Sequence, residues 1–326
     1  MGEVSLSQSA PAKINLYLHV TGRRPDGYHE LDSLVVFADV GDRIEVSPGE
    51  GLSLEISGPF GDDLAADDDN LVLRAARALA ARTNRRANAH LHLVKNLPVA
   101  SGIGGGSADA AATLKVLSQF WNIELDDADI HHVAHDVADN MDTARALSTL
   151  FKLWRDDLGD EMLSTIGLEL GADVPVCLEG RPVFMGGIGE KLDLAPHLPP
   201  VWLVLVNPGV SVSTPTIFKA RSGPFSKVDR FHNHPKDAAE LANLLKQRQN
   251  DLSEPAIASL PEIQQALGIL DQQNHVLLSR MSGSGATCFG MFETAQHAAD
   301  AAAEISKQYP DWWCVAAEML DLPIDF

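Results

Sequence analysis

The segment PVASGIGGGS, residues 98–107, decides how the chain folds, because it joins a strand-like segment to a helix-like one through four closely spaced glycines. Residues 89–98 alternate apolar and polar side chains, and residues 108–121 are alanine-rich without glycine or proline. Consecutive glycines leave backbone N–H groups open to a ligand, and a helix start adds partial positive charge. Ser107 adds a hydroxyl that suits a phosphate oxygen or a metal ion. The segment therefore predicts a cradle for an anion such as a phosphate.

Two other kinds of phosphate loop do not fit this segment. A P-loop requires a lysine and then Ser or Thr at its end, whereas Gly106 and Ser107 are followed by Ala108 and Asp109. A dinucleotide-binding turn requires a third glycine at the position of Ser107. A turn that only packs a helix against a sheet stays the structural alternative.

The segments around the loop predict a chain in which strands and helices alternate. A β-rich opening is expected at residues 13–20, 31–40, 43–46 and 52–56. An acidic stretch that ends at Asn70 predicts the N-cap of a helix over residues 71–82. A long helix-favouring segment should end at Gly171. Beyond it we expect strands at 200–209, 276–292 and 312–320, helices at 238–250, 261–270 and 295–309, and a second domain that starts between residues 186 and 198.

Composition excludes several classes of protein. The 326 residues are 45% hydrophobic, which is enough for two modest domains with real cores. The formal net charge of −20 repels polyanions, and no basic patch is evident, so we expect no nucleic acid partner. Cys177, Cys288 and Cys314 show no paired spacing and predict free, partly buried thiols. No apolar run reaches the roughly 18 residues of a membrane span, so we expect a cytoplasmic protein without a membrane partner.

Five segments carry a resemblance to a known family. The strand that contains Lys13, the loop at 98–107 and the turn MSGSGA (281–286) occur in the order and spacing of the GHMP kinases. The segments APAKINL (10–16), RPDGYHEL (24–31) and GADVP (171–175) resemble the branch of that family that acts on a cytidine diphosphate-linked methylerythritol. The resemblance covers nearly the whole chain.

The resemblance implies a fold and an activity. The implied fold is α+β, with a ribosomal-protein-S5-like ATP-binding domain expected at residues 1–190 and a ferredoxin-like domain at residues 191–326. The implied reaction transfers a phosphoryl group from ATP, with Mg²⁺, to the 2-hydroxyl of the CDP-linked methylerythritol in non-mevalonate isoprenoid biosynthesis. We expect a monomer or weak homodimer whose partner is this small-molecule substrate.

Asp173 and Lys13 are the predicted catalytic residues. Phosphoryl transfer needs positioning, neutralisation of charge and a group that receives the hydroxyl proton. Asp173 lies in a neutral, partly apolar segment, where a carboxylate needs a partner to stay ionised. Lys13, in an equally apolar strand, could be that partner. Taken alone, each residue fits a structural ion pair better, and the match to the family motif favours the catalytic role.

The acceptor and nucleotide residues are assigned by the same resemblance. Asn15 shares a strand face with Lys13, and Tyr28 and His29 match the family's cytidine-recognising pair, in which a ring stacks on the base and a histidine reads its edge. Phe218 matches a second stacking ring, although a core position is the alternative, and Thr214 lies near the substrate. Among the nucleotide residues, Asn70 is equally well explained as a helix cap. The residues expected to hold ATP are Asn70, Lys95, Pro98, Val99, Ala100, Ser101, Gly102, Ile103, Gly104, Gly105, Gly106, Ser107 and Ala108.

Three features depart from the family or from a simple kinase site. The family usually has a glycine and then a small residue where Ala100 and Ser101 stand. The distance along the chain from Ser107 to Asp173 is long, with an apparent insertion around residues 130–162 that we assign no function. His131, His132, His135 and Asp136 suit a solvated helix better than a metal site, because no third ligand is placed. Mg²⁺ is expected to enter with ATP, and its protein ligands are left open.

Three rival functions remain to be compared. Another GHMP kinase, of the homoserine or mevalonate type, would share the loop but not the segment PDGYH at residues 25–29. A non-catalytic nucleotide-binding protein is disfavoured by the presence of both Lys13 and Asp173. A nicotinamide-dependent oxidoreductase is disfavoured by the missing third glycine.

Overall fold

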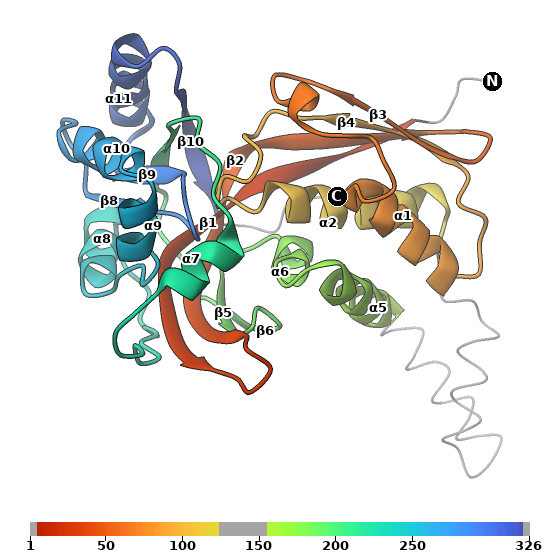
Figure 1. The fold of residues 1–326 in the computed structure, drawn as a ribbon, viewed down its shortest axis with the longest axis horizontal. Coiled ribbons are helices and arrows are strands. Elements are labelled where there is room, and N and C mark those ends of the chain that lie inside the picture. Colours follow the sequence, from red (N-terminus) through yellow and green to blue (C-terminus); the bar gives the residue numbers. More distant parts are fainter. Residues whose placement is uncertain (1–4, 124–154, 322–326) are drawn as a thin grey trace.

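The structure, a computed structural model, describes residues 5–123 and 155–321. The strands of this part form one ten-stranded sheet in the order β3-β4-β2-β10-β7-β9-β8, with β1 paired to β2 and β5 paired to β2 and β6. Figure 1 shows the long strands β1 and β2 running from one half of the molecule into the other. The strands are β1 (Leu6–Arg23), β2 (His29–Ser47), β3 (Leu52–Ser57), β4 (Ala89–Val94), β5 (Val183–Gly187), β6 (Lys191–Leu194), β7 (Trp202–Asn207), β8 (Leu278–Met281), β9 (Cys288–Phe292) and β10 (Trp313–Leu320).

The helices divide into two groups that cover different parts of this sheet. The first group lies beneath β2, β3 and β4, and the second surrounds the strands β7 to β10 (Figure 1). We call these parts the N-terminal and C-terminal halves. The first group is α1 (Leu71–Arg82), α2 (Gly105–Phe120), α5 (Arg155–Leu170) and α6 (Val174–Glu179). The second is α7 (Thr214–Ala220), α8 (Ala238–Lys246), α9 (Ser253–Ser259), α10 (Glu262–Asp271) and α11 (Ala295–Gln308). A short 3₁₀ turn occupies Gly61–Asp63.

The β1–β2 pair extends through both halves of the molecule. The two strands pair antiparallel from Leu6 opposite Val46 to Arg23 opposite His29. Residues 12–20 of β1 are buried without a break, because both faces of the sheet are covered there. A strand that is covered on both faces usually has a nearly continuous run of apolar residues, and β1 has one that is interrupted by only a few polar residues. Those buried polar positions include Lys13 and Asn15, so β1 carries site residues through the core.

The core of the N-terminal half fixes the direction of the helix that follows the glycine-rich loop. Leu114 and Leu117 of α2 pack with Leu79 of α1 and Leu91 of β4, and all four side chains are fully buried. Four of the nine residues that α2 buries are alanines, whose small side chains let the helix lie close to the sheet. The start of α2 is therefore held rigidly at the edge of the core.

The C-terminal strand joins the two halves. Met319 and Leu320 of β10 pair with Ala38 and Phe37 of β2, while Trp313 to Glu318 pair with β7. The expected boundary between residues 190 and 191 falls in the turn between β5 and β6, which pair antiparallel from Val183 opposite Leu194. We keep the two-domain division as a proposal and place its boundary after Leu194, so that this hairpin stays within one domain.

An ion pair between a buried carboxylate and a partly buried arginine links β2 to the segment between α7 and α8. The fully buried Asp32 carboxylate accepts from the Tyr17 hydroxyl at 3.0 Å, the Asp229 amide at 3.0 Å and the Arg230 Nε at 2.6 Å. The same guanidinium also contacts the exposed Asp193 at 2.6 Å. The inner pair holds the connecting segment against the sheet.

Most of the elements expected from local patterns are present. The helix expected over 71–82 matches α1, and the segment expected to end at Gly171 does so as α5, which ends at Leu170. The strand expected over 276–292 is a hairpin, because the chain turns back between β8 and β9. The three cysteines are free, and Cys177 and Cys288 are buried. Within residues 5–123 and 155–321, no helix has the length and apolarity needed to cross a membrane.

Two sequence-based interpretations fall on other parts of the chain. The histidine cluster at residues 131–136 and most of the apparent insertion around residues 130–162 lie outside the described residues.

We predict that Arg230→Met lowers the free energy of unfolding by about 3 kcal/mol, because it leaves the Asp32 carboxylate buried without its cation. Urea denaturation of the purified variant measures this change. Asp193→Ala is the matched control: it removes the exposed partner of the same guanidinium and should cost less than about 1 kcal/mol. Equal losses in the two variants would contradict a special role for the buried pair.

Candidate functional site

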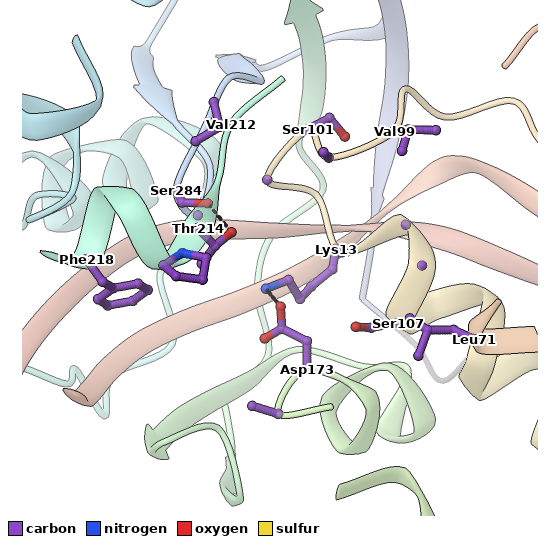
Figure 2. A pocket seen from close by; sticks show the side chains of 18 of the residues that line it. Lys13, Leu71, Val99, Ser101, Ser107, Asp173, Val212, Thr214, Phe218 and Ser284 are labelled. Carbon is purple, nitrogen blue, oxygen red and sulfur yellow. Dashed lines mark hydrogen bonds and ion pairs between the residues drawn. The ribbon is translucent and has the colours of Figure 1, made fainter. Parts of the chain in front are cut away.

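A large cavity of about 1170 Å³ runs along the glycine-rich loop between the two halves. Figure 2 shows Lys13 and Asp173 meeting within it, with Ser107 toward one end and Phe218 toward the other. The end at α1 and β4 holds the residues predicted to bind the nucleoside, and the end at α7 and the β1–β2 turn holds those predicted to bind the acceptor. We call them the nucleoside end and the acceptor end. The predicted site residues that line the cavity are Lys13, Asn15, Tyr28, His29, Asn70, Lys95, Pro98, Val99, Ala100, Ser101, Gly102, Gly104, Gly105, Gly106, Ser107, Asp173, Thr214 and Phe218.

Two predicted nucleotide residues point away from the cavity into the core. The Ile103 side chain is fully buried among Leu97, Leu205 and other apolar residues of the sheet. Ala108 is buried in the core of the N-terminal half. These side chains therefore anchor the loop from behind.

Lys13 and Asp173 form the ion pair that their apolar surroundings predict. The Lys13 Nζ donates to the Asp173 Oδ2 at 2.9 Å. The lysine side chain is 4% exposed, whereas the aspartate is 37% exposed and faces the cavity. Lys13 comes from the centre of β1, and Asp173 immediately precedes α6. The pair thus brings an anchored ammonium and an accessible carboxylate to one place.

Asn15 presents an acceptor atom with no protein partner. Its Nδ2 donates to the Ser33 Oγ at 2.8 Å, and that hydroxyl donates to the Tyr17 carbonyl at 2.6 Å. These bonds fix the amide's orientation. Its buried Oδ1 has no hydrogen-bond partner among the described residues, and Asn15 lines the cavity beside Lys13. Buried polar atoms are nearly always paired, so this oxygen is suited to a hydroxyl of the acceptor.

The loop's carbonyls are tied to strands far away in sequence. The Ile103 carbonyl accepts from the Lys13 amide at 2.9 Å, and the Ser101 carbonyl accepts from the Thr287 amide at 3.0 Å. The Gly102 carbonyl accepts from the Ser282 hydroxyl at 3.2 Å. The loop is therefore held by the N-terminal strand on one side and by the β8–β9 turn on the other.

The amides at the start of α2 are free of a side-chain cap. Gly104 is the N-cap residue, at φ +64°, and its lack of a side chain leaves the first N–H groups of the helix uncapped by a side chain. Such groups bind anions readily, because the helix dipole adds to their own positive charge. This geometry fits the phosphates of a nucleotide.

Ala100 occupies a backbone conformation that normally belongs to glycine. Its φ is +50°, in the left-handed region, which costs an L-residue roughly 1–2 kcal/mol. The family's usual glycine at this position would adopt it without that cost. The carbonyl of Ala100 accepts from the Val212 amide at 3.3 Å, and this bond helps to hold the strained residue in place.

The acceptor end is aromatic and carries positive charge. The rings of His29 and Phe218 are stacked, with centroids 5.2 Å apart, while Tyr28 is 61% exposed on the same rim. Burial lowers the pKa of His29 from its ordinary value, and the charges of Arg23 and Arg221 lower it further. The lowered pKa favours the neutral form of His29, which has one ring nitrogen to donate and one to accept. Thr214 shares a hydrogen bond of 2.8 Å with the Ser284 hydroxyl.

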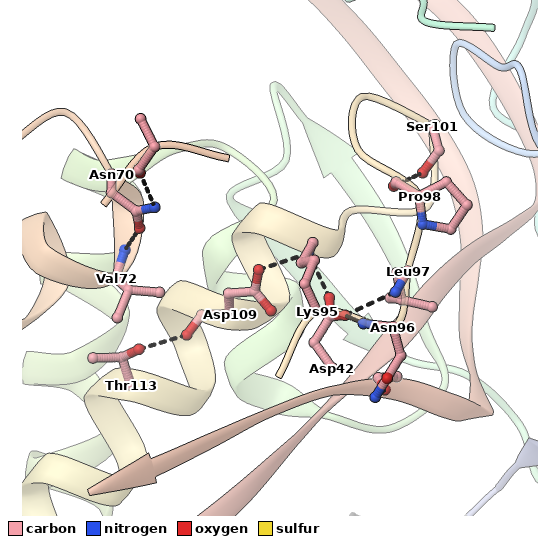
Figure 3. Close-up of polar contacts among 12 residues, drawn as sticks. Asp42, Asn70, Val72, Lys95, Asn96, Leu97, Pro98, Ser101, Asp109 and Thr113 are labelled. Carbon is pink, nitrogen blue, oxygen red and sulfur yellow. Dashed lines mark hydrogen bonds and ion pairs between the residues drawn. The ribbon is translucent and has the colours of Figure 1, made fainter. Parts of the chain in front are cut away.

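At the nucleoside end, both predicted residues have protein partners. Asn70 caps α1 by accepting from the Val72 amide at 3.0 Å, which confirms the capping role. Lys95 is 2% exposed and pairs with Asp42 and Asp109 (Figure 3). Neither aspartate was identified from the sequence. Asp109 lies two residues after the glycine-rich segment, but only the fold brings Asp42 to Lys95.

We predict that Gly102→Ala weakens ATP binding by about tenfold, which corresponds to 1.4 kcal/mol. A Cβ at this residue would meet the Gly285 carbonyl and lie 2.7 Å from the Ser282 carbonyl, so the loop must move. Gly209→Ala is the matched control, because Gly209 has nearly the same φ, +77° against +76°, but open space around it. Isothermal titration with ATP measures both affinities. Equal losses of ATP affinity in the two variants would show that the close packing of Gly102 against the β8–β9 turn does not matter for ATP binding.

Comparisons with known proteins agree with this geometry. The family model described as the GHMP kinases N terminal domain matches residues 70–149, and the one described as GHMP kinases C terminal matches residues 228–311. A 4-diphosphocytidyl-2-C-methyl-D-erythritol kinase from Paramagnetospirillum magneticum is 48% identical over 316 residues, which cover 97% of this chain and 99% of the relative.

Solved structures agree as well. A crystal structure of 4-(cytidine 5'-diphospho)-2C-methyl-D-erythritol kinase is similar with a TM-score of 0.68 and 30% identity, covering 96% of this chain and 99% of that one. A homoserine kinase from Cytophaga hutchinsonii has a TM-score of 0.64 at 13% identity, with 97% of this chain and 95% of that chain covered, and shares the fold. The expected GHMP kinase fold is thereby confirmed, and the chain belongs to the GHMP kinases and, within them, to the 4-diphosphocytidyl-2-C-methyl-D-erythritol kinase family.

Proposed function

We propose that this chain transfers the γ-phosphoryl group of ATP to the 2-hydroxyl of 4-(cytidine 5'-diphospho)-2-C-methyl-D-erythritol, giving the 2-phosphate and ADP. The observation that carries the proposal is the position of the Lys13–Asp173 pair, which lines the same cavity as an uncapped helix start and an aromatic acceptor end. One end suits phosphates and the other suits a nucleobase. The pair that joins them suits a hydroxyl nucleophile.

In the proposed reaction Asp173 receives the proton of the acceptor hydroxyl. The hydroxyl oxygen forms a bond to the γ-phosphorus while the bond between that phosphorus and the bridging oxygen of ADP breaks. The accessible carboxylate is the proton acceptor, and Lys13, held at 2.9 Å from it, stabilises negative charge on the transferred group. The uncapped amides of α2 hold the phosphates in line for the transfer.

Magnesium is part of this proposal as the partner of ATP. Bound to the nucleotide, Mg²⁺ neutralises phosphate charge during the transfer, and such ions usually keep several waters and few protein ligands. The start of α2 has room for a metal-bound nucleotide, because its glycines have no side chains. The Ser107 hydroxyl lies there on the cavity wall. We leave the protein ligands of the ion open.

The acceptor end supports a cytidine-containing substrate. Tyr28 and Phe218 offer ring faces for a base, and neutral His29 offers both a donor and an acceptor for its edge. Asn15 offers its unpaired Oδ1 to a hydroxyl near the reacting centre. The homoserine and mevalonate kinases stay the alternative type, and their similarity at 12–13% identity is one of fold. We expect the protein to act in the cytoplasm as a monomer or weak homodimer, without nucleic acid or membrane partners.

We predict that the purified protein consumes ATP with the CDP-linked methylerythritol and not with homoserine or mevalonate, because only the first has a base for the acceptor end. ADP release in a coupled assay and phosphorus NMR of the product measure this. Turnover with homoserine or mevalonate alone would move the chain to the alternative type, and no turnover with any of the three would refute the proposal.

We predict that Asp173→Asn lowers kcat by about 10² to 10⁴-fold, because the amide cannot take the hydroxyl proton. Thermal unfolding should stay near that of the wild type, since the amide still accepts from Lys13. Single-turnover rates with saturating ATP measure the effect. Near-normal kcat in this variant would exclude Asp173 as the base.

A further inference from the structure

Three charged side chains are buried together behind the glycine-rich loop. The Lys95 ammonium contacts the Asp42 Oδ2 and lies 2.8 Å from the Asp109 Oδ2, and none of the three side chains is more than 3% exposed. Figure 3 shows the lysine between the two aspartates, with α2 on one side and β2 on the other. We call these three residues the charged cluster.

Stability does not explain such a cluster. Burying charges carries a desolvation penalty that their attraction often fails to recover, and apolar residues of similar size commonly replace buried ion pairs without loss. Here two carboxyl groups share one ammonium, so the ammonium can balance the charge of only one of them. Burial raises the pKa of the Asp109 carboxyl well above its ordinary value, Lys95 offsets part of this, and Asp42 adds to it.

The members of the cluster sit at both ends of the loop. The Asp42 Oδ1 accepts from the amides of Asn96 at 2.6 Å and Leu97 at 2.8 Å, the two residues that lead into Pro98. Asp109 lies in the first turns of α2, just after the glycines. Lys95 bridges the two aspartates. The residues before the loop and the helix after it are therefore both linked to the Lys95 ammonium.

The ammonium also lies directly against the start of α2. A Cβ built at Gly105 would be 3.1 Å from the Lys95 Nζ and 3.6 Å from the Asp42 Oδ2. A displacement of the cluster would thus shift the amides of the first helical turn, which are the proposed phosphate ligands. Asp109 and Lys95 both line the cavity, and the Asp109 Oδ1 has no partner in the described part of the chain.

We propose that Lys95, Asp42 and Asp109 are positioning residues for the nucleotide, which clamp both ends of the glycine-rich loop and hold the first amides of α2 in place for the phosphates. The inference rests on the proposed use of ATP. In this proposal Lys95 acts through Asp42 and Asp109, which it bridges. It also explains why two acidic residues lie beneath an anion site, where an unpaired negative charge would weaken phosphate binding.

The test measures ATP affinity by isothermal titration in the full-length protein without acceptor, together with KM for each substrate and the thermal unfolding temperature. Asp109→Ala and Lys95→Met should each raise the Kd for ATP by about tenfold or more, because the loop loses its clamp. KM for the acceptor should change less than about twofold. Asp109→Asn, which keeps an acceptor for Lys95, should recover most of the affinity that Asp109→Ala loses.

Asp32→Asn is the matched control, because it alters another fully buried carboxylate that pairs with a cation but does not line the cavity. It should lower the unfolding temperature without changing the Kd for ATP. The proposal is overturned if Asp109→Ala lowers only the unfolding temperature, as Asp32→Asn does, or if Asp109→Asn binds ATP as poorly as Asp109→Ala. Should Lys95→Met fail to fold, the two Asp109 variants decide alone. Failure of the proposed function is a separate result, seen as absent ATP binding or turnover in the wild type.

Discussion

The contact between two glycine-rich backbones is the constraint on which the rest of the site depends. A Cβ at Gly102 would lie 2.7 Å from the Ser282 carbonyl, and a Cβ at Gly283 would lie 2.6 Å from the Gly102 carbonyl. Neither segment can carry a side chain here unless the other retreats. Because the segments meet at van der Waals distance, the loop reaches β1, where the Lys13 amide binds the Ile103 carbonyl. The position of Lys13 relative to the loop thus depends on two missing side chains about 180 residues apart in sequence.

A chain with a net charge of −20 needs a particular way of binding a polyphosphate. The site has no broad basic surface. In the proposed mode of binding, backbone dipoles at the start of α2 act together with single lysines, each of which is paired with a carboxylate. Lys13 and Lys95 are both almost fully buried and each contacts a carboxylate. Local dipoles act over a few ångströms, so they attract a phosphate in the cradle while the acidic surface still repels polyanions elsewhere.

Features encoded in short segments were predictable from the sequence. The strand-loop-helix unit around residues 98–107, the Asn70 cap and the Lys13–Asp173 pair depend on local spacing or on a motif, and all three are present. The charged cluster was not predictable, because Asp42 reaches Lys95 only through the pairing of β2 with β4. Ile103 and Ala108 looked like ligand contacts in a linear motif, but the packing of the loop turns their side chains into the core. The short elements β5, β6, α7 and α9 carry too few residues for a clear periodic pattern and are stabilised by tertiary packing.

The carbonyl bonds of the loop have a thermodynamic consequence. Ser101 and Gly102 belong to the N-terminal half, yet their carbonyls accept from Thr287 and Ser282 of the C-terminal half. A nucleotide that orders the loop therefore also favours the docked arrangement of the β8–β9 turn, and the two equilibria share free energy reciprocally. Nucleotide binding at the loop would then be linked to the docking of the β8–β9 turn against it. Amides of the β8–β9 turn, which need not contact ATP, would exchange their hydrogens more slowly whenever ATP is bound.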